Sequence, residues 1–251
     1  MFRANILRMT VAADKAAEFE AECRNQLRVV TEREAGTILY GFFRRAGAAS
    51  TILPAVPKNH VEYIHLMGYR DEDAQKLHFK IEHNPEAQWA WGRVFQTFMA
   101  APWVAEHFET ADIVTGVSRD HHWEPGTMFR FTFHRFKVQE GRGEEFEREA
   151  KKQLDIVKAR EPGTVLYTFC RRSPNGSGLL PKSASTHPEY LHFMAYKDEK
   201  AAQLHREIEF DPNAEWTWGK TFRGFLEAPL ENESILSEGL VTGITRDQVW
   251  D

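Results

Sequence analysis

The sequence has little of several features that would have narrowed its function. Only two cysteines occur among 251 residues, Cys23 and Cys170. Two are too few for a disulfide framework or a cysteine-rich zinc site. The formal net charge is −5, so positive charge is not in excess. The chain therefore lacks the basic surface with which proteins bind nucleic acids or acidic membranes, and we expect neither partner.

Long apolar runs are also missing. The first residues, Met1 to Arg8, contain no uninterrupted hydrophobic stretch like that of a signal peptide, and no later segment approaches the length of a membrane span. Neither a Gly-x-Gly-x-x-Gly motif nor a P-loop is present, so the sequence offers no dinucleotide or nucleotide site. We therefore expect a soluble cytoplasmic protein.

What the sequence does contain is a repeat of itself. A shift of 127 positions aligns residues 3–124 with residues 130–251 without a gap and gives 51 identities in 122 positions. A period of this length is a domain repeat, because each copy is large enough to have its own core. We predict two domains, 1–122 and 128–251, joined by a short connector.

Each copy has the same predicted order of strands and helices. Alternating residues such as Phe131 and Phe133 indicate strands, whereas apolar residues three and four apart indicate helices. Gly36 and Gly163 end the first helix of each copy. The expected strands are 3–11, 37–45, 61–70 and 113–119 in copy one, and 130–138, 164–172, 188–197 and 240–246 in copy two. A loop of about fifteen residues separates the second strand from the third, and loops of this length often form lids or rims.

Apolar stripes predict which helix faces are buried. Asp71 and Asp198 are placed as N-caps of the second helix. The first helix has the stripe Phe19, Cys23, Leu27 and Val30, repeated as Phe146, Ala150, Leu154 and Val157. The second helix has Ala74, Leu77, His78 and Ile81, repeated as Ala201, Leu204, His205 and Ile208. A third helical segment carries Trp91, Phe95 and Phe98, repeated as Trp218, Phe222 and Phe225.

This order predicts an α+β protein built from two tandem ferredoxin-like domains. In each domain, helices cover one face of a four-stranded antiparallel sheet. The other face needs an apolar partner, and the second copy on the same chain supplies it. We therefore expect the two sheets to pack face to face as an intramolecular pseudo-dimeric α+β barrel. Whether the fused molecules pair again as a homodimer is left open.

Two motifs resemble those of the antibiotic biosynthesis monooxygenase-like family of the dimeric α+β barrel superfamily. The first motif is Glu-(Pro/Ala)-Gly-Thr-x-x-Tyr, at 34–40 and 161–167. The second is Tyr69-x-Asp71-x-x-Ala74-x-x-x-His78, repeated as Tyr196-x-Asp198-x-x-Ala201-x-x-x-His205. Together the motifs span most of both copies, which makes the chain similar to a tandem fusion of two such domains.

The resemblance implies a barrel formed from two ferredoxin-like units. Some relatives oxidise polycyclic phenols to quinones with molecular oxygen and neither flavin nor metal, others degrade haem, and many have no known activity. This chain departs from the family pattern, because Met67 and Gly68 stand where many relatives carry a carboxylate, as do Met194 and Ala195 in the second copy.

His78 and His205 are the candidate catalytic residues. Each lies on the apolar face of the second helix, where an imidazole is shielded from water and sensitive to its neighbours. Either histidine would serve as a general base, or as a hydrogen-bond donor, towards a phenolic substrate. The alternative is a core histidine whose nitrogens are satisfied within the protein.

Further aromatic and basic residues are candidates for substrate binding. Period-two spacing puts tyrosines, a histidine and a methionine on one face of the third strand, which suits stacking on a flat aromatic ligand. The alternative is inter-sheet packing. These residues are Tyr63, His65, Met67 and Tyr69, repeated as Tyr190, His192, Met194 and Tyr196. Four tryptophans, Trp89, Trp91, Trp216 and Trp218, are either core residues or parts of the pocket mouth, and Arg44 and Arg171 either bind a substrate oxygen or pair with surface glutamates.

A metal site is the remaining chemical alternative. His78 and Glu82 are four residues apart on one helix, as are His205 and Glu209, and a further histidine would complete the ligand set of non-haem iron oxygenases. This spacing supplies only two of three ligands, so we predict no metal and no cofactor.

The sequence therefore predicts a cofactor-independent monooxygenase that oxidises a small or polycyclic phenolic compound. A non-catalytic protein that binds a small aromatic molecule is the main alternative. A metal-dependent oxygenase and a haem-degrading enzyme are lesser ones. Unequal residues at matched positions, such as Leu7 against His134, allow one pocket to be active and the other not.

Overall fold

The computed structural model describes residues 3–45, 59–102, 104–123, 125–126, 130–172, 187–228 and 231–250. The long loops predicted between the second and third strands lie outside these ranges. Copy one contains β1 (Arg3–Ala12), α1 (Ala16–Arg33), β2 (Thr37–Arg45), β3 (His60–Tyr69), α2 (Glu72–Glu82), α3 (Trp91–Val94), β4 (Val104–Ser118) and β5 (His121–Trp123). Copy two contains β6 (Arg130–Lys137), α4 (Gly143–Arg160), β7 (Thr164–Arg172), β8 (Glu189–Tyr196), α5 (Glu199–Glu209), α6 (Trp218–Arg223), β9 (Glu231–Thr245) and β10 (Gln248–Trp250). Short 3₁₀ turns at Ala13–Lys15 and Phe95–Phe98 adjoin α1 and α3.

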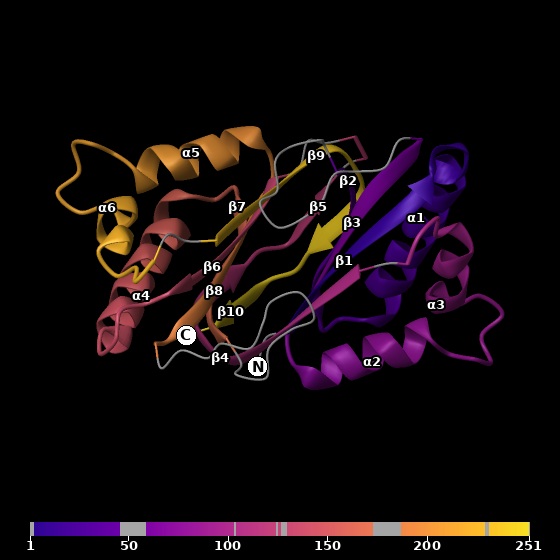
Figure 1. Ribbon diagram of the computed structural model, residues 1–251, viewed down its shortest axis with the longest axis horizontal. Helices are drawn as coiled ribbons and strands as arrows, with labels where there is room; N and C mark the ends of the chain where they lie inside the picture. Colours follow the sequence, from indigo (N-terminus) through magenta and orange to yellow (C-terminus); the bar gives the residue numbers. More distant parts are fainter. Residues whose placement is uncertain are drawn as a thin grey trace.

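The strands form a closed barrel. Around it the order is β1-β3-β2-β9-β6-β8-β7-β4, and β4 pairs with β1 to close the ring. Helices α1 to α3 cover one side of the barrel and α4 to α6 cover the opposite side (Figure 1). None of the helices in the described ranges is both long and apolar enough to cross a membrane. The closed barrel with helices on two opposite sides confirms the predicted α+β pseudo-dimer.

The interior of the barrel is a packed apolar core. Trp123 closes part of it and donates its indole N–H to the Tyr196 carbonyl at 3.3 Å. Both copies supply the buried residues, which include Ile38, Phe43, Ile64, Leu66, Phe131, Val165, Leu191 and Phe193. The two sheets therefore bury the faces that their own helices leave uncovered, as the alternation of apolar residues predicts.

The strands β4 and β9 are longer than predicted. Each has 15 residues, whereas the sequence indicated only the second half of each. The first half of β4 pairs with β1 of its own copy and the second half with β7 of the other copy. In the same way, β9 pairs first with β6 and then with β2. Residues 104–112 lack a regular apolar alternation, which is why their extended structure went unpredicted.

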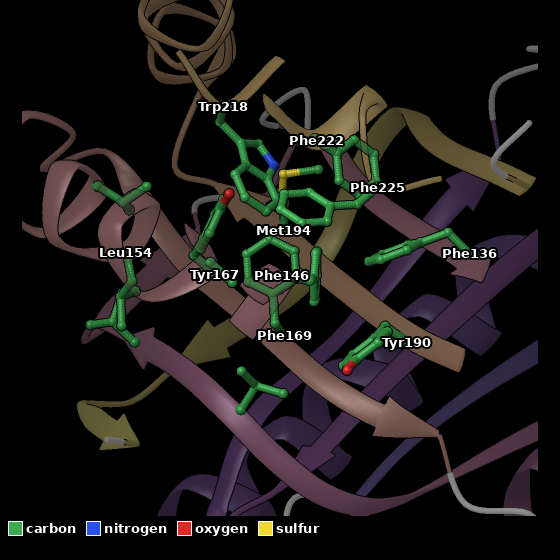
Figure 2. Close-up of a cluster of buried hydrophobic side chains, with 14 of the residues drawn as sticks. Phe136, Phe146, Leu154, Tyr167, Phe169, Tyr190, Met194, Trp218, Phe222 and Phe225 are labelled. Atoms are coloured by element: carbon green, nitrogen blue, oxygen red, sulfur yellow. The ribbon is translucent and has the colours of Figure 1, made fainter. Parts of the chain in front are cut away.

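These long strands carry side chains across to the other copy. Val241 and Ile244 of β9 lie in the core between α1 and the sheet of copy one. Val114 and Val117 of β4 lie in the corresponding core of copy two. Figure 2 shows part of that second core. Each helix-covered core is therefore completed by a strand of the other copy.

Arg119 and Arg246 cap helices of the opposite copy. Arg119 donates to the carbonyl oxygens of Val157 and Glu161 at the end of α4, at 3.2 and 3.0 Å. Arg246 makes the equivalent bonds to the end of α1. The last carbonyls of a helix have no partner within it and attract positive charge. The arginines therefore fix each helix against the strand of its neighbour.

The first-helix stripes are buried as predicted, but the second-helix face is not the one expected. Ala74 and His78 are buried, whereas Leu77 is 42% exposed and Leu204 is 37% exposed. Glu82 is buried instead, one turn beyond His78. The predicted inward position of the two leucines is therefore wrong. The carboxylate lies inward because an imidazole provides the partner that a buried charge requires.

The predicted N-caps are confirmed and allow a direct test. The Asp71 and Asp198 carboxylates each accept the backbone N–H three residues later at 2.8 Å. We expect Asp71→Ala to lower the free energy of unfolding by about 1 kcal/mol, because that N–H loses its partner. Urea titration measures the change. Asp73→Ala removes a charge from the same turn without removing the cap, so an equal loss in that variant would contradict the capping role.

Candidate functional site

The polar face of the third strand points towards the helices and not into the barrel. Ile64 and Leu66 belong to the barrel core, whereas Tyr63, Met67 and Tyr69 belong to the core under α1 and α2. The strand β8 has the same arrangement in the second copy. The alternative of inter-sheet packing is therefore wrong for these residues, and any pocket that they form lies within one copy.

A cavity of about 300 Å³ lies in the second copy, between the sheet and the helices α5 and α6. Four residues predicted to form a site line it, together with a methionine and a glutamate: His192, Met194, Tyr196, His205, Glu209 and Trp218. In Figure 2, Met194 and Trp218 lie together at one end of the core, and Tyr190 lies apart from them. The volume is at the lower end of the range for small-molecule sites.

His205 is held between two carboxylates. Its Nδ1 lies 2.7 Å from Glu161 Oε2, and its Nε2 lies 3.4 Å from Glu209 Oε2. Burial alone would lower the pKa of the imidazole, but the hydrogen bonds and negative charges of both glutamates outweigh burial and raise the pKa to about 9. His205 is therefore a cation at neutral pH, which favours the predicted role of donor over that of base.

The first copy repeats this arrangement. His78 Nδ1 lies 2.7 Å from Glu34 Oε2, and His78 Nε2 lies 3.2 Å from Glu82 Oε2. The two carboxylates again outweigh burial and raise the pKa of His78 to about 9. The two copies differ at more than half of their aligned positions, yet His78, Glu34 and Glu82 are identical to their counterparts. The histidine with two glutamates is thus a shared property of both halves.

A second histidine in each copy, His65 or His192, has a pKa that is lowered and not raised. Burial and the positive charge of His78 hold the pKa of His65 well below 6.5. Burial, His134 and His205 do the same for His192. Both side chains are therefore neutral at pH 7.

Each neutral histidine has one buried ring nitrogen, Nε2, that makes no hydrogen bond within the described residues, and in His65 this nitrogen is an acceptor. His65 Nδ1 lies 3.1 Å from the Gly41 carbonyl oxygen, so this nitrogen carries the proton and Nε2 is the acceptor. Within the described residues, the Nε2 atoms of His65 and His192 are buried and have no hydrogen-bond partner. In the second copy this histidine lines the cavity.

Tyr167 lies between the two histidines and was not among the predicted site residues. Its ring centre is 4.4 Å from that of His192 and 5.7 Å from that of His205. Burial raises its pKa well above 10, so the phenol keeps its proton. Tyr40 has the same place in copy one. Identity between the copies is the signal in the sequence that marks both tyrosines and the glutamates Glu34 and Glu161.

Three kinds of predicted binding residue lie away from the cavity lining. Tyr190 donates to Glu147 at 2.8 Å, and Arg171 donates to the same carboxylate at 2.7 Å. Trp216 donates to Glu149 at 2.9 Å. Their counterparts Tyr63, Arg44 and Trp89 bond in the same way to Glu20 and Glu22 of α1. The structure thus ties these side chains to the first helix of each copy, and their binding role stays a prediction.

The two tryptophans of each pair have separate environments. Trp91 and Trp218 begin their helices and are 1% and 2% exposed. Trp89 and Trp216 precede the helices and are only partly buried. The sequence predicted that one tryptophan of each pair is a core residue, but it placed both on the helical segment, whereas the helices begin at Trp91 and Trp218.

The arrangement around the histidine cations does not suit a metal ion. The two glutamates contact opposite nitrogens of one ring, so their carboxylates do not converge on a common point. An imidazole that ligates a metal must also be neutral. Within the described ranges, no group of three histidine, cysteine, aspartate or glutamate side chains has the geometry of a metal site.

Comparison with known proteins identifies the fold. No family model matches the sequence, and no curated protein matches it. A protein named "putative monooxygenase" from Lactobacillus acidophilus NCFM has a similar structure, with a TM-score of 0.64 and 13% identity over 100% of this chain and 99% of its own. Another of that name from Fusobacterium nucleatum has a TM-score of 0.63 and 13% identity, covering 100% of this chain and 97% of its own. The chain therefore shares the dimeric α+β barrel fold over its whole length.

Proposed function

We propose that the second-copy cavity binds a small phenolic compound and promotes its oxidation by molecular oxygen without a cofactor. One observation carries this proposal: a neutral histidine and a cationic histidine line the same cavity. Neighbouring groups whose pKa values are driven apart are typical of acid–base chemistry. The fold, which is similar to that of proteins named as monooxygenases, supports the same class of reaction.

The two histidines have different roles in this proposal. His192 Nε2 accepts the proton of the substrate hydroxyl, since this nitrogen is neutral and has no partner among the described residues. The His205 cation stabilises the negative charge that develops on the substrate oxygen. Proton transfer and charge stabilisation thus act on the same substrate oxygen.

The electron-rich substrate anion then reduces oxygen directly. Carbon–oxygen bond formation gives a peroxide of the substrate. Cleavage of its O–O bond leaves one oxygen atom as a quinone carbonyl and releases the other as water. The substrate loses four electrons and oxygen gains four, so the reaction needs no external reductant. Tyr196 and Trp218 hold the ring by stacking along the cavity wall.

Oxygen uptake with a panel of phenols tests this function. The purified protein, prepared in chelator, is mixed with naphthols and anthrone in an oxygen electrode. We expect one oxygen molecule to be consumed for each quinone formed, with no hydrogen peroxide released. Binding of these compounds without oxygen uptake would identify the protein as a non-catalytic carrier instead.

A further inference from the structure

The second-copy cavity has a rim of three arginines, and the first copy has an arginine at only one of the matched positions, Arg3 opposite Arg130. Arg130, Arg206 and Arg223 line the cavity together with the His205 cation. Glu209 is the one carboxylate in the lining, and Glu161 and Glu199 contact His205 and Arg130 without being part of the lining. The lining therefore carries four positive charges and one negative charge. The two further carboxylates, outside the lining, do not fully neutralise it.

The other contacts of the three rim arginines leave some of their N–H donors unused. Arg130 and Arg206 share a single carboxylate, that of Glu199, at 3.2 and 3.1 Å. Arg130 Nε is buried without a hydrogen-bond partner in the described part of the chain. Arg223 lies 6.0 Å over the ring of Phe210 and has no ion-pair partner among the described residues. Donors therefore remain for a ligand at the cavity rim.

The duplicated copy provides an internal comparison. The alignment by 127 positions places Phe79 opposite Arg206 and Gln96 opposite Arg223. His192, His205, Tyr196 and Trp218 are identical between the copies, whereas His134 of the lining is replaced by Leu7 in copy one. Two of the three rim arginines, Arg206 and Arg223, are therefore specific to the second copy.

From these observations we infer that the second-copy site selects an aromatic carboxylic acid that carries a ring hydroxyl. The carboxylate binds the arginine rim by charge-assisted hydrogen bonds, which guanidinium groups form with planar, two-oxygen acceptors. The hydroxyl lies at His192 and His205, at the inner end. This inference rests on the proposed function for the placement of the hydroxyl, but the preference for an acid is a property of binding alone.

A matched pair of ligands tests the inference by calorimetry. Both 6-hydroxy-2-naphthoate and 2-naphthol have the same rings and hydroxyl, and only the first has a carboxylate. We expect the acid to bind about tenfold more tightly or better at low salt, and the difference to shrink as salt screens the rim. Equal affinities would overturn the inference.

Substitution with the residues of the other copy locates the effect. Arg206→Phe with Arg223→Gln is expected to weaken binding of the acid about tenfold and to leave 2-naphthol unchanged. Arg148→Gln removes a charge from the exposed surface of α4 and serves as the control. A preference for the acid that survives the double substitution would overturn the proposed role of the rim.

The outcomes separate the two proposals. Preference for the acid without oxygen uptake on either compound retains the inference and contradicts the proposed oxidation. Oxygen uptake with 2-naphthol, combined with equal affinities for both compounds, supports the proposed oxidation and contradicts the inferred preference for an acid. Neither result depends on the other measurement.

Discussion

His192→Ala is expected to reduce the rate of oxygen uptake by about 100-fold or more at saturating substrate. The substitution removes the proposed acceptor for the substrate proton, and general base catalysis contributes at least this much in typical cases. The Michaelis constant should change much less, because Tyr196 and Trp218 continue to hold the ring. Initial rates in the oxygen electrode measure both quantities.

The first copy supplies the matched control. His65→Ala makes the same change at an equivalent buried position, where the histidine also lacks a partner for Nε2 within the described ranges. We expect this variant to retain most of the activity towards a ligand bound in the second-copy cavity. Unchanged turnover in His192→Ala, or equal losses in the two variants, would contradict the assignment of catalysis to His192.

His205→Gln is expected to lower the free energy of unfolding by about 3–5 kcal/mol. The substitution leaves the buried Glu161 and the partly buried Glu209 without the cation that both contact, and removal of one partner of a buried ion pair has an effect of this size. Guanidinium denaturation monitored by tryptophan fluorescence measures it. The double variant Glu161→Gln/His205→Gln lacks one of the uncompensated charges. It should be less destabilised than the two single effects added together.

The pH dependence of stability follows from the same histidines. The folded-state pKa of about 9 lies above the unfolded value of 6.5. The stabilisation is therefore complete below about pH 6.5 and disappears as the pH rises through 9. We expect a loss of up to about 3 kcal/mol for each histidine over this window. A flat profile between these pH values would contradict the cationic state.

Most of the fold could be predicted from the sequence because the two copies confirm each other's periodicity. The strand Thr37–Arg45 and its repeat Thr164–Arg172 begin and end where predicted. The halves of β4 and β9 that were missed contain charged residues without alternation. Their extended conformation comes from pairing with β1 and β6, which no local pattern reports.

The candidate site was predicted in part for a related reason. His205 was found because it lies on an apolar helix face, but Glu161, its closer partner, is 44 residues away in the sequence. Only the folded chain brings the two together. Tyr190 was predicted to bind substrate because it shares a strand face with His192. In the structure it lies outside the cavity lining and donates its hydroxyl to Glu147 of α4.

The crossing of β4 and β9 between the copies has a further consequence. In an assembly of two identical chains, every substitution appears at both sites at once, so a change that suits one ligand alters both. Here each copy has its own stretch of sequence, so the two can differ. The strands β4 and β9, which pair with the other copy, keep one copy of each kind together in a fixed orientation. Phe79 and Arg206 illustrate the result, because matched positions of the two copies carry an aromatic ring and a cation on the same scaffold.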